Sequence, residues 1–238
     1  MIFIILMVVY TMQVYLRRKG TYISCATVHK YMKKMQLFSV SRRKKPGYVH
    51  GAAHKVYDNR LKQNFHANKR KWKWCTDFTY LTLADGSKRY NCTIIDLYDR
   101  SVTASITDRK ITSDLEKRTL EKAIRSQSGI DLKQLILHSD QGSQYTSREF
   151  TEFCIEKGIT QSMSKAGYPY DNAPMERYFN TLKTELIYQH NYRTETELYS
   201  AIEEFAYVHY NHVRPHSYNN YKTPFETRYG RYKPDTKI

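Results

Sequence analysis

The chain has 238 residues, which is enough for one substantial hydrophobic core and a smaller appendage. Its formal net charge is +16, and residues 1–73 carry all of this excess with 17 Lys and Arg against one acid, whereas residues 74–238 hold 22 of each sign. Such a basic segment indicates a polyanionic partner, either nucleic acid or an acidic lipid surface. The four cysteines have neither zinc-ligand nor disulfide-framework spacing, so we expect a reducing, cytoplasmic compartment.

The chain begins with an apolar run, MIFIILMVVY. Ten apolar residues are too few to span a bilayer, and the run lacks the basic leader and small-residue cleavage site of a signal peptide. We therefore expect no membrane role and favour nucleic acid as the partner of the basic segment.

Residues 24–38 predict a basic helix. Ser24 suits the N-cap, and Val28, Met32 and Met35 share one face. The opposite face carries three lysines, Lys30, Lys33 and Lys34. This pattern fits the second helix of a helix-turn-helix, whose exposed face would enter a DNA major groove, and it fits an ordinary basic surface helix equally well.

Four consecutive basic residues follow, Arg42, Arg43, Lys44 and Lys45, and a Pro-Gly pair ends the run. From there to about residue 71 the sequence is polar with little periodicity, which is typical of a linker that tracks DNA. We therefore predict three parts: a basic helical segment at 1–47, a basic linker at 48–71, and a core with C-terminal helices at 72–238.

Three short runs rich in β-branched and aromatic residues begin the core and predict antiparallel strands: KWCTDFTYL, RYNCTIIDL and SVTASIT. The turn ADGSK joins the first two as a hairpin. A helix at about 112–127, the apolar strand LKQLILHSD, a helix at about 147–158 and the strand ITQSMS follow. Two further helices, one with the sequence PMERYFNTLKTE and one at about 195–211, complete an α/β fold with a mixed sheet flanked by helices.

The helix PMERYFNTLKTE begins where Asp171 or Asn172 can cap it. Its apolar positions are spaced to face a core: Met175, Phe179, Leu182 and Leu186. Glu176 lies in the first turn, and Lys183, seven residues later, projects from the same side. Considered alone, Glu176 fits a solvated acid at the positive end of the helix dipole.

Two aspartates occupy unusual positions, one within a predicted core strand and one at the end of another. Asp77 lies in the middle of the first core strand, against strand propensity, and Asp140 ends the strand LILHSD, where α/β sheets place their ligands. Each also fits a bland role, Asp77 as a satisfied polar residue at an edge and Asp140 as a turn former. The elements bearing these aspartates and Glu176 can meet at one edge of a sheet, where clustered carboxylates suit a divalent cation such as Mg²⁺ or Mn²⁺. Two such ions can promote displacement at a phosphodiester.

Three nearby residues each fit two roles. We interpret His138 as a packed histidine, with steering of a water or phosphate as the alternative. Tyr168 and Tyr170, in the loop before Glu176, can stack on an unpaired terminal base or can simply be exposed.

Four segments together resemble the catalytic subunit of bacterial insertion-sequence transposases of the IS-three type: WCTDFTYL, HSDQGSQYTSREF, SMSKAGYPYDNAPMERYFNTLKTE and YNHVRPHSYNNYKTPFE. Thirty-five residues separate Asp140 from Glu176, which is the family's spacing, and Lys183 follows the glutamate by seven. The resemblance implies a ribonuclease-H-like fold similar to the retroviral integrase core. It further implies Asp77, Asp140 and Glu176 as catalytic ligands of a pair of Mg²⁺ or Mn²⁺ ions, and Lys183 as a DNA contact.

The same resemblance implies a reaction and partners. It implies cleavage and strand transfer of element ends without a covalent protein intermediate, on double-stranded DNA, by a homo-oligomer in a synaptic complex. We also expect from it a fusion partner encoded in an upstream reading frame. It further implies that the protein acts in a bacterial cytoplasm, near the nucleoid. The segment KGTYISCATVHKYMKKMQL resembles the second half of the family's helix-turn-helix, whereas residues 1–12 depart from the family pattern.

Two rivals remain at the level of sequence. A nuclease of the same fold would hydrolyse DNA without joining it. A catalytically incompetent copy would bind DNA and regulate its own element, although the intact Asp77, Asp140 and Glu176 argue against this.

Overall fold

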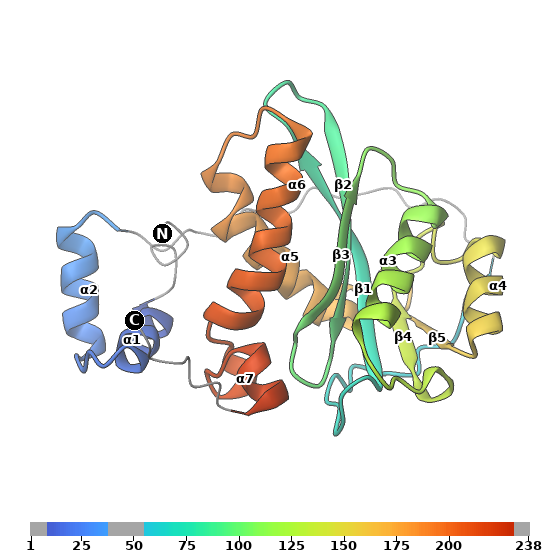
Figure 1. Ribbon diagram of the computed structural model, residues 1–238, viewed down its shortest axis with the longest axis horizontal. Helices are drawn as coiled ribbons and strands as arrows, with labels where there is room; N and C mark the ends of the chain where they lie inside the picture. Colours follow the sequence, from blue (N-terminus) through green and yellow to red (C-terminus); the bar gives the residue numbers. More distant parts are fainter. Residues whose placement is uncertain (1–8, 38–54, 231–238) are drawn as a thin grey trace.

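The computed structural model describes residues 9–37 and 55–230. Five strands form one mixed sheet in the order β3-β2-β1-β4-β5 (Figure 1). The antiparallel part consists of β1 (Lys73–Thr82), β2 (Lys88–Asp96) and β3 (Val102–Asp108). The parallel part adds β4 (Ile136–Ser139) beside β1, and β5 (Thr160–Met163) beside β4. The ribonuclease-H-like mixed sheet expected from sequence is therefore present.

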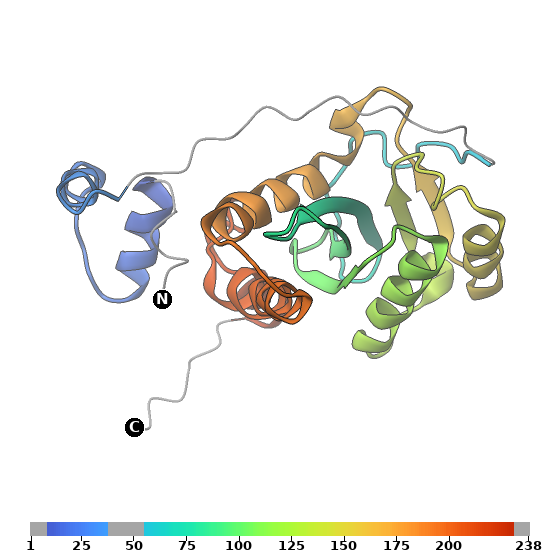
Figure 2. The same ribbon diagram turned by 90° about the horizontal axis from the view of Figure 1, so that it is seen from above.

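Helices cover both faces of this sheet (Figures 1 and 2). One layer consists of α3 (Ser113–Ser126) and α4 (Arg148–Lys157). The other consists of α5 (Ala173–Glu185), α6 (Glu195–Glu203) and the π-helix η4 (Glu204–Val213). Shorter helices are η1 (Leu132–Gln134), η2 (Pro169–Asn172), η3 (Ile187–Gln189), η5 (Ser217–Asn219) and α7 (Pro224–Tyr229). The helix expected over 195–211 thus exists, but it changes from α to π geometry after Glu203.

Alternating side chains of β1 supply the two cores. Trp74 packs with Leu120 and Phe150 of α3 and α4, whereas Cys75 and Leu81 join the cluster under α5, α6 and η4. This follows from the two-residue period of a strand, which sends neighbouring side chains to opposite faces. The sheet is therefore buried on both sides, and polar side chains at its rim can be assigned to one layer or the other.

The hairpin and helix ends follow the local chemistry of their sequences. Gly86 adopts φ +85° in the β1–β2 turn, and the Asp85 carboxylate accepts a hydrogen bond from Ser87 N (2.8 Å). Thr194 and Glu197 form a capping box that starts α6. Local signals of this kind explain why most elements begin where the sequence predicts.

Both edge strands have backbone groups covered by other parts of the chain. At β3, Asn211 bonds both the N–H and the C=O of Val102 (2.9 and 3.0 Å), and the hydroxyl of Tyr207 accepts from Ser105 N (2.8 Å). At β5, Met163 N donates to the carbonyl oxygen of Asp58 (3.4 Å). These contacts occupy groups that an edge strand would otherwise present to solvent.

Two helices precede the core, α1 (Val9–Arg18) and α2 (Cys25–Lys34). Ser24 is the N-cap of α2, as predicted, and its side chain accepts from Thr27 N (3.1 Å). Met12, Val28 and Met32 form a small core between them. Met35 was expected on the buried face, but it is the C-cap residue and is 58% exposed, because the helix ends before it.

The helix α1 is docked on the C-terminal end of the core. Arg18 donates to the carbonyl oxygen of Tyr221 (2.9 Å) and forms an ion pair with Glu226, and the rings of Tyr10 and Tyr221 stand edge to face with centroids 5.0 Å apart. Within the residues described, no helix has the length and apolar character needed to cross a membrane.

Part of the segment predicted as a linker packs with the core. Leu61 and Ala67 are buried in the cluster under α5 and α6, and Phe65 lies against that cluster. The chain is thus anchored to the core before the first strand begins, although this segment reads as polar in sequence. The basic run at 42–45 lies outside the described residues.

Candidate active site

The β1–β4 register carries Asp77 and Asp140 to neighbouring positions. Cys75 of β1 pairs with His138 of β4 in a parallel ladder, so two more residues along each strand reach Asp77 and Asp140. Paired residues of a parallel ladder project to the same face, and Cys75 lies on the face covered by α5. Asp77 therefore lies on the α5 side of the sheet, and Asp140 follows directly after the last residue of β4.

Asp140 occupies a tight turn. Its Oδ1 accepts a hydrogen bond from Gly142 N (2.8 Å), and a Cβ placed on Gly142 would lie only 2.9 Å from that oxygen. A larger residue at this position would displace the Asp140 carboxylate. Asp77 is similarly held, with Oδ1 accepting from Phe78 N (2.8 Å). Both side chains are half-buried and remain accessible to solvent.

The helix that carries Glu176 starts beside these strands. Asn172 occupies the N-cap position of α5, and its Nδ2 donates to the carbonyl oxygen of Thr76 (3.2 Å), the residue before Asp77. Asp171 or Asn172 was expected to cap α5; Asn172 occupies the N-cap position, but its side chain makes this strand contact and no cap hydrogen bond. Glu176, half-buried in the first turn, therefore follows an anchor point directly adjacent to Asp77.

His138 fixes the same helix start from the other strand. Its Nε2 lies 2.8 Å from the carbonyl oxygen of Asp171, which can only accept, so Nε2 carries the proton. Its Nδ1 then accepts from the hydroxyl of Ser162 on β5 (2.9 Å). Burial lowers the pKa of His138 to about 4, so the ring is neutral near pH 7. The prediction of a packed histidine is confirmed.

The three predicted carboxylates thus come from the neighbouring strands β1 and β4, near the carboxyl end of β4, and from the first turn of α5. Among the described residues, no three His, Cys, Asp or Glu side chains lie close enough to hold a metal ion between them. The donor set itself fits Mg²⁺ or Mn²⁺, because three accessible carboxylates supply hard oxygen ligands and leave room for water. The fold therefore brings the three elements together without gathering the carboxylates into a closed cluster.

Sequence reasoning missed Glu116, an acid on α3. It is 1% exposed, and neither carboxyl oxygen has a hydrogen-bond partner. Burial, with a further contribution from the negative charge of Asp140, raises the pKa of Glu116 well above its ordinary value. Its helical spacing to the buried Leu120 and Ala123 was the signal that could have revealed it.

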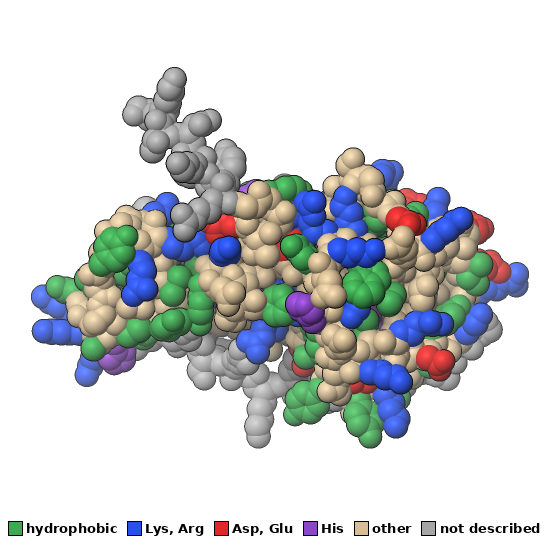
Figure 3. Space-filling model, turned by 90° about the horizontal axis from the view of Figure 1, so that it is seen from below, with side chains coloured by type: hydrophobic (Ala, Val, Ile, Leu, Met, Phe, Trp, Pro, Cys, Tyr) green, Lys and Arg blue, Asp and Glu red, His purple; other side chains and the backbone are tan. Residues whose placement is uncertain are grey.

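The predicted DNA contacts are distributed over separate surfaces. Lys183 lies two turns after Glu176 on α5 and is half-buried, whereas Lys30, Lys33 and Lys34 are exposed on α2. Figure 3 shows basic side chains on the N-terminal helices and across the core on the face that it presents. Tyr168 at the start of η2 and Tyr170 within it are 52% and 73% exposed.

Comparison with known proteins identifies the family. Two models, both described as integrase core domain, match residues 67–169 and 157–224. The chain is 32% identical over 212 residues to the transposase for insertion sequence element IS904 of Lactococcus lactis, covering 88% of this chain and 82% of that protein. It is also 32% identical over 220 residues to the putative transposase InsK for IS150 of Escherichia coli, covering 92% and 76%.

Solved structures show the same fold. A chain of the simian T-cell lymphotropic virus intasome in complex with PP2A regulatory subunit B56 gamma aligns with TM-score 0.57 and 18% identity over 95% of this chain and 72% of that chain. The HTLV-2 integrase catalytic core domain in complex with magnesium aligns with TM-score 0.50 and 20% identity over 67% and 96%. The shared architecture is that of retroviral integrase cores.

Proposed function

The chain belongs to the insertion-sequence transposases with an integrase core domain, and on that premise we propose that it cuts the ends of its element and joins them to target DNA with Asp77, Asp140 and Glu176 as catalytic residues. The observation that carries this assignment is the β1–β4 register together with the Asn172–Thr76 hydrogen bond. These contacts bring the two strand aspartates and the first turn of α5 to one rim of the sheet.

We infer that the three carboxylates hold two Mg²⁺ or Mn²⁺ ions. When bound, such a pair activates the nucleophile and stabilises the leaving oxygen of a phosphodiester. The chain's own contribution is to hold the ligands: Gly142 N orients Asp140, Phe78 N orients Asp77, and the anchored start of α5 presents Glu176. The magnesium named for the HTLV-2 core supports this choice of metal.

The partners follow from the charge distribution and the family. We propose that residues 1–47 bind double-stranded DNA, that residues 48–71 connect them to the core, and that copies of the chain assemble on the element ends. A protein fused to the product of an upstream reading frame is a further proposed partner in this assembly. The assigned DNA contacts are Lys183, Lys30, Lys33, Lys34, Arg42, Arg43, Lys44 and Lys45.

The test uses duplex DNA carrying the inverted repeats that flank the coding region, assayed for cleavage and joining in Mg²⁺. Glu176→Gln keeps the size of the side chain but removes a charged metal ligand, so both activities should fall by roughly a thousandfold or more. Asp77→Asn and Asp140→Asn should behave alike. The matched control is Glu156→Gln, an exposed acid on α4.

DNA binding without metal should be the same for wild type and Glu176→Gln. Strand transfer by Glu176→Gln at the rate of Glu156→Gln would reject the site. Cleavage without any joined product in the wild type would identify the nuclease rival, and specific end binding with neither activity would identify the regulatory copy.

A further inference from the structure

Asp171, two residues before α5, is held by the segment that precedes the core. Its carboxylate accepts hydrogen bonds from Asn59 Nδ2 (2.9 Å), Gln63 Nε2 (2.9 Å) and Lys165 N (3.0 Å). The side chain is 5% exposed, so these donors replace the water that a carboxylate needs. Two of the three donors come from residues more than 100 positions away in the chain.

Asp171 and Asn172 together contact both strands that carry the catalytic aspartates, Asp171 through its backbone carbonyl and Asn172 through its side-chain amide. The carbonyl oxygen of Asp171 accepts from His138 of β4, and the next residue, Asn172, donates to Thr76 of β1. One dipeptide therefore joins the preceding segment, two strands and the catalytic helix. A shift of Asp171 would be transmitted to the first turn of α5, because Glu176 is only five residues further on.

The segment that supplies the two amides has a defined shape. Lys62 and Gln63 adopt φ values of +45° and +62°, a left-handed conformation that costs free energy in residues other than glycine. Leu61 is buried in the core, and Asn59 Oδ1 accepts from Lys62 N (2.8 Å). This turn therefore presents both side-chain amides to Asp171.

We propose that Asn59 and Gln63 are positioning residues for the reaction: through Asp171 they fix the first turn of α5 and thereby the place of Glu176 relative to Asp77 and Asp140. The inference rests on the proposed function of Glu176. Its physical basis is that three carboxylates around a metal site repel one another, so the helix start needs a restraint against moving away. Displacements of about 1 Å are enough to reduce catalysis by roughly a hundredfold.

The test compares the double variant Asn59→Ala/Gln63→Ala with Asn68→Ala, an exposed asparagine in the same segment. Single-turnover cleavage of end DNA is measured against Mg²⁺ concentration below the melting temperature of both proteins. The double variant should cleave about tenfold more slowly at limiting Mg²⁺ and recover toward the control at high Mg²⁺. DNA affinity without metal should be the same in both.

A second readout does not depend on activity. Mn²⁺ stabilises a folded protein that binds it, so the melting temperature is titrated with Mn²⁺. The double variant should need several-fold more Mn²⁺ than Asn68→Ala for the same increase. Asp171→Asn replaces one accepting oxygen with an NH₂ group that faces other hydrogen-bond donors. This variant should require the same higher Mn²⁺ concentration as the double variant.

The outcomes separate this inference from the proposed function. If the double variant has the Mg²⁺ and Mn²⁺ dependence of Asn68→Ala while Glu176→Gln is inactive, the positioning role is wrong and the active site stands. The positioning role is also overturned if the double variant cleaves more slowly only because less of it is folded, and its dependence on Mg²⁺ and Mn²⁺ is unchanged. An active Glu176→Gln would instead remove the proposed function itself.

Discussion

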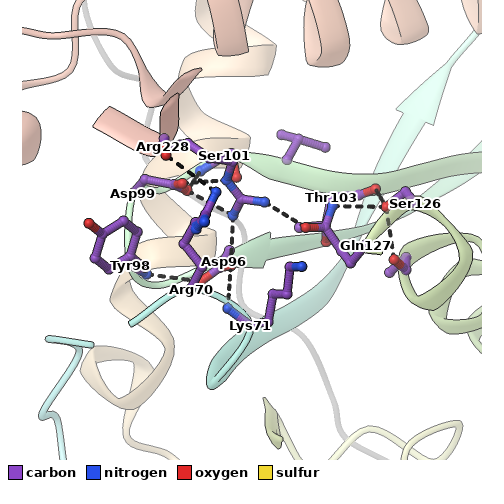
Figure 4. A network of polar contacts seen from close by, with 12 residues as sticks. Arg70, Lys71, Asp96, Tyr98, Asp99, Ser101, Thr103, Ser126, Gln127 and Arg228 are labelled. Carbon is purple, nitrogen blue, oxygen red and sulfur yellow. Dashed lines mark hydrogen bonds and ion pairs between the residues drawn. The ribbon is translucent and has the colours of Figure 1, made fainter. Parts of the chain in front are cut away.

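Arg228 of α7 and Asp99 of the β2–β3 turn form an ion pair with Nε and Oδ2 2.5 Å apart and with side chains 2% and 0% exposed. The same guanidinium donates to Asp96 (2.7 Å) and Gln127 (2.6 Å), as Figure 4 shows. Lys71 N and Tyr98 N complete the bonds to Asp96. The helix α7 is thereby tied to the end of the sheet by buried ion pairs and hydrogen bonds.

Replacing Arg228 should strongly lower the free energy of unfolding. Arg228→Ala leaves two buried carboxylates without their cation, and breaking a buried ion pair in this way costs about 3–5 kcal/mol of unfolding free energy. Urea denaturation of wild type and variant measures the difference. Arg148→Ala, whose partner Glu152 is also exposed, is the control and should leave stability unchanged. Equal midpoints for the two variants would contradict the structural role.

Glu116 should make stability fall as the pH rises. Its pKa in the folded protein lies well above the ordinary 4.5, so the folded state holds a proton that the unfolded state has lost. The stabilisation is complete below pH 4.5 and is lost as the pH rises through the folded pKa. Glu116→Gln remains neutral, so its melting temperature should decrease less than that of wild type between pH 5 and 8.

The control for this pH effect is Glu121→Gln on the same helix, where the carboxylate is 37% exposed and forms an ion pair with Arg125. This variant removes an acid from the same helix at a position in contact with solvent. A Glu116→Gln profile that runs parallel to wild type would show that Glu116 does not titrate differently on folding.

Lys183 should contribute to DNA binding without affecting the metal. Lys183→Ala should weaken binding to element ends by about 1–3 kcal/mol, which is typical for loss of a charge-assisted contact. Fluorescence anisotropy with end DNA measures the change, and Lys157→Ala at the end of α4, in the opposite layer, is the control. If both variants bind end DNA equally, Lys183 is not a DNA contact.

Deleting residues 1–47 should remove most nonspecific DNA affinity and flatten its dependence on salt. This segment holds ten Lys and Arg and no acid, and the slope of log affinity against log salt counts neutralised phosphates. The deletion stops at residue 47 because Leu61 and Ala67 belong to the core. A truncated protein with the wild-type slope would place the DNA-binding charge elsewhere.

Sequence predicted the fold well where periodicity and turn chemistry act locally. The alternating strand pattern, the Ser24 cap and the apolar stripe of α5 all correspond to elements of the structure, and Met175 and Leu182 are fully buried as expected. The change to π geometry after Glu203 was not predictable, because helical spacing alone does not distinguish α from π over so short a segment.

The candidate site residues could be found in the sequence because their positions are unusual. The residues that hold the site in place could not be found in this way. Asp77 and Asp140 stand out within or at the end of strands, and their neighbourhood follows once β1 and β4 are paired. Asp171 instead resembled an ordinary cap, because its partners Asn59 and Gln63 are distant in sequence and lie in a segment without periodicity. Contacts of this kind depend on tertiary folding and leave no local pattern.

The covered edges of the sheet bear on how several copies can share one DNA molecule. Element ends brought together would concentrate transposase chains, and exposed strand edges at high local concentration favour pairing between molecules. With Val102 and Ser105 bonded to Asn211 and Tyr207 at one edge, and Met163 bonded to Asp58 at the other, crowding offers little opportunity for such pairing. The chain can therefore accumulate on DNA with less risk of aggregating through its own β-strands.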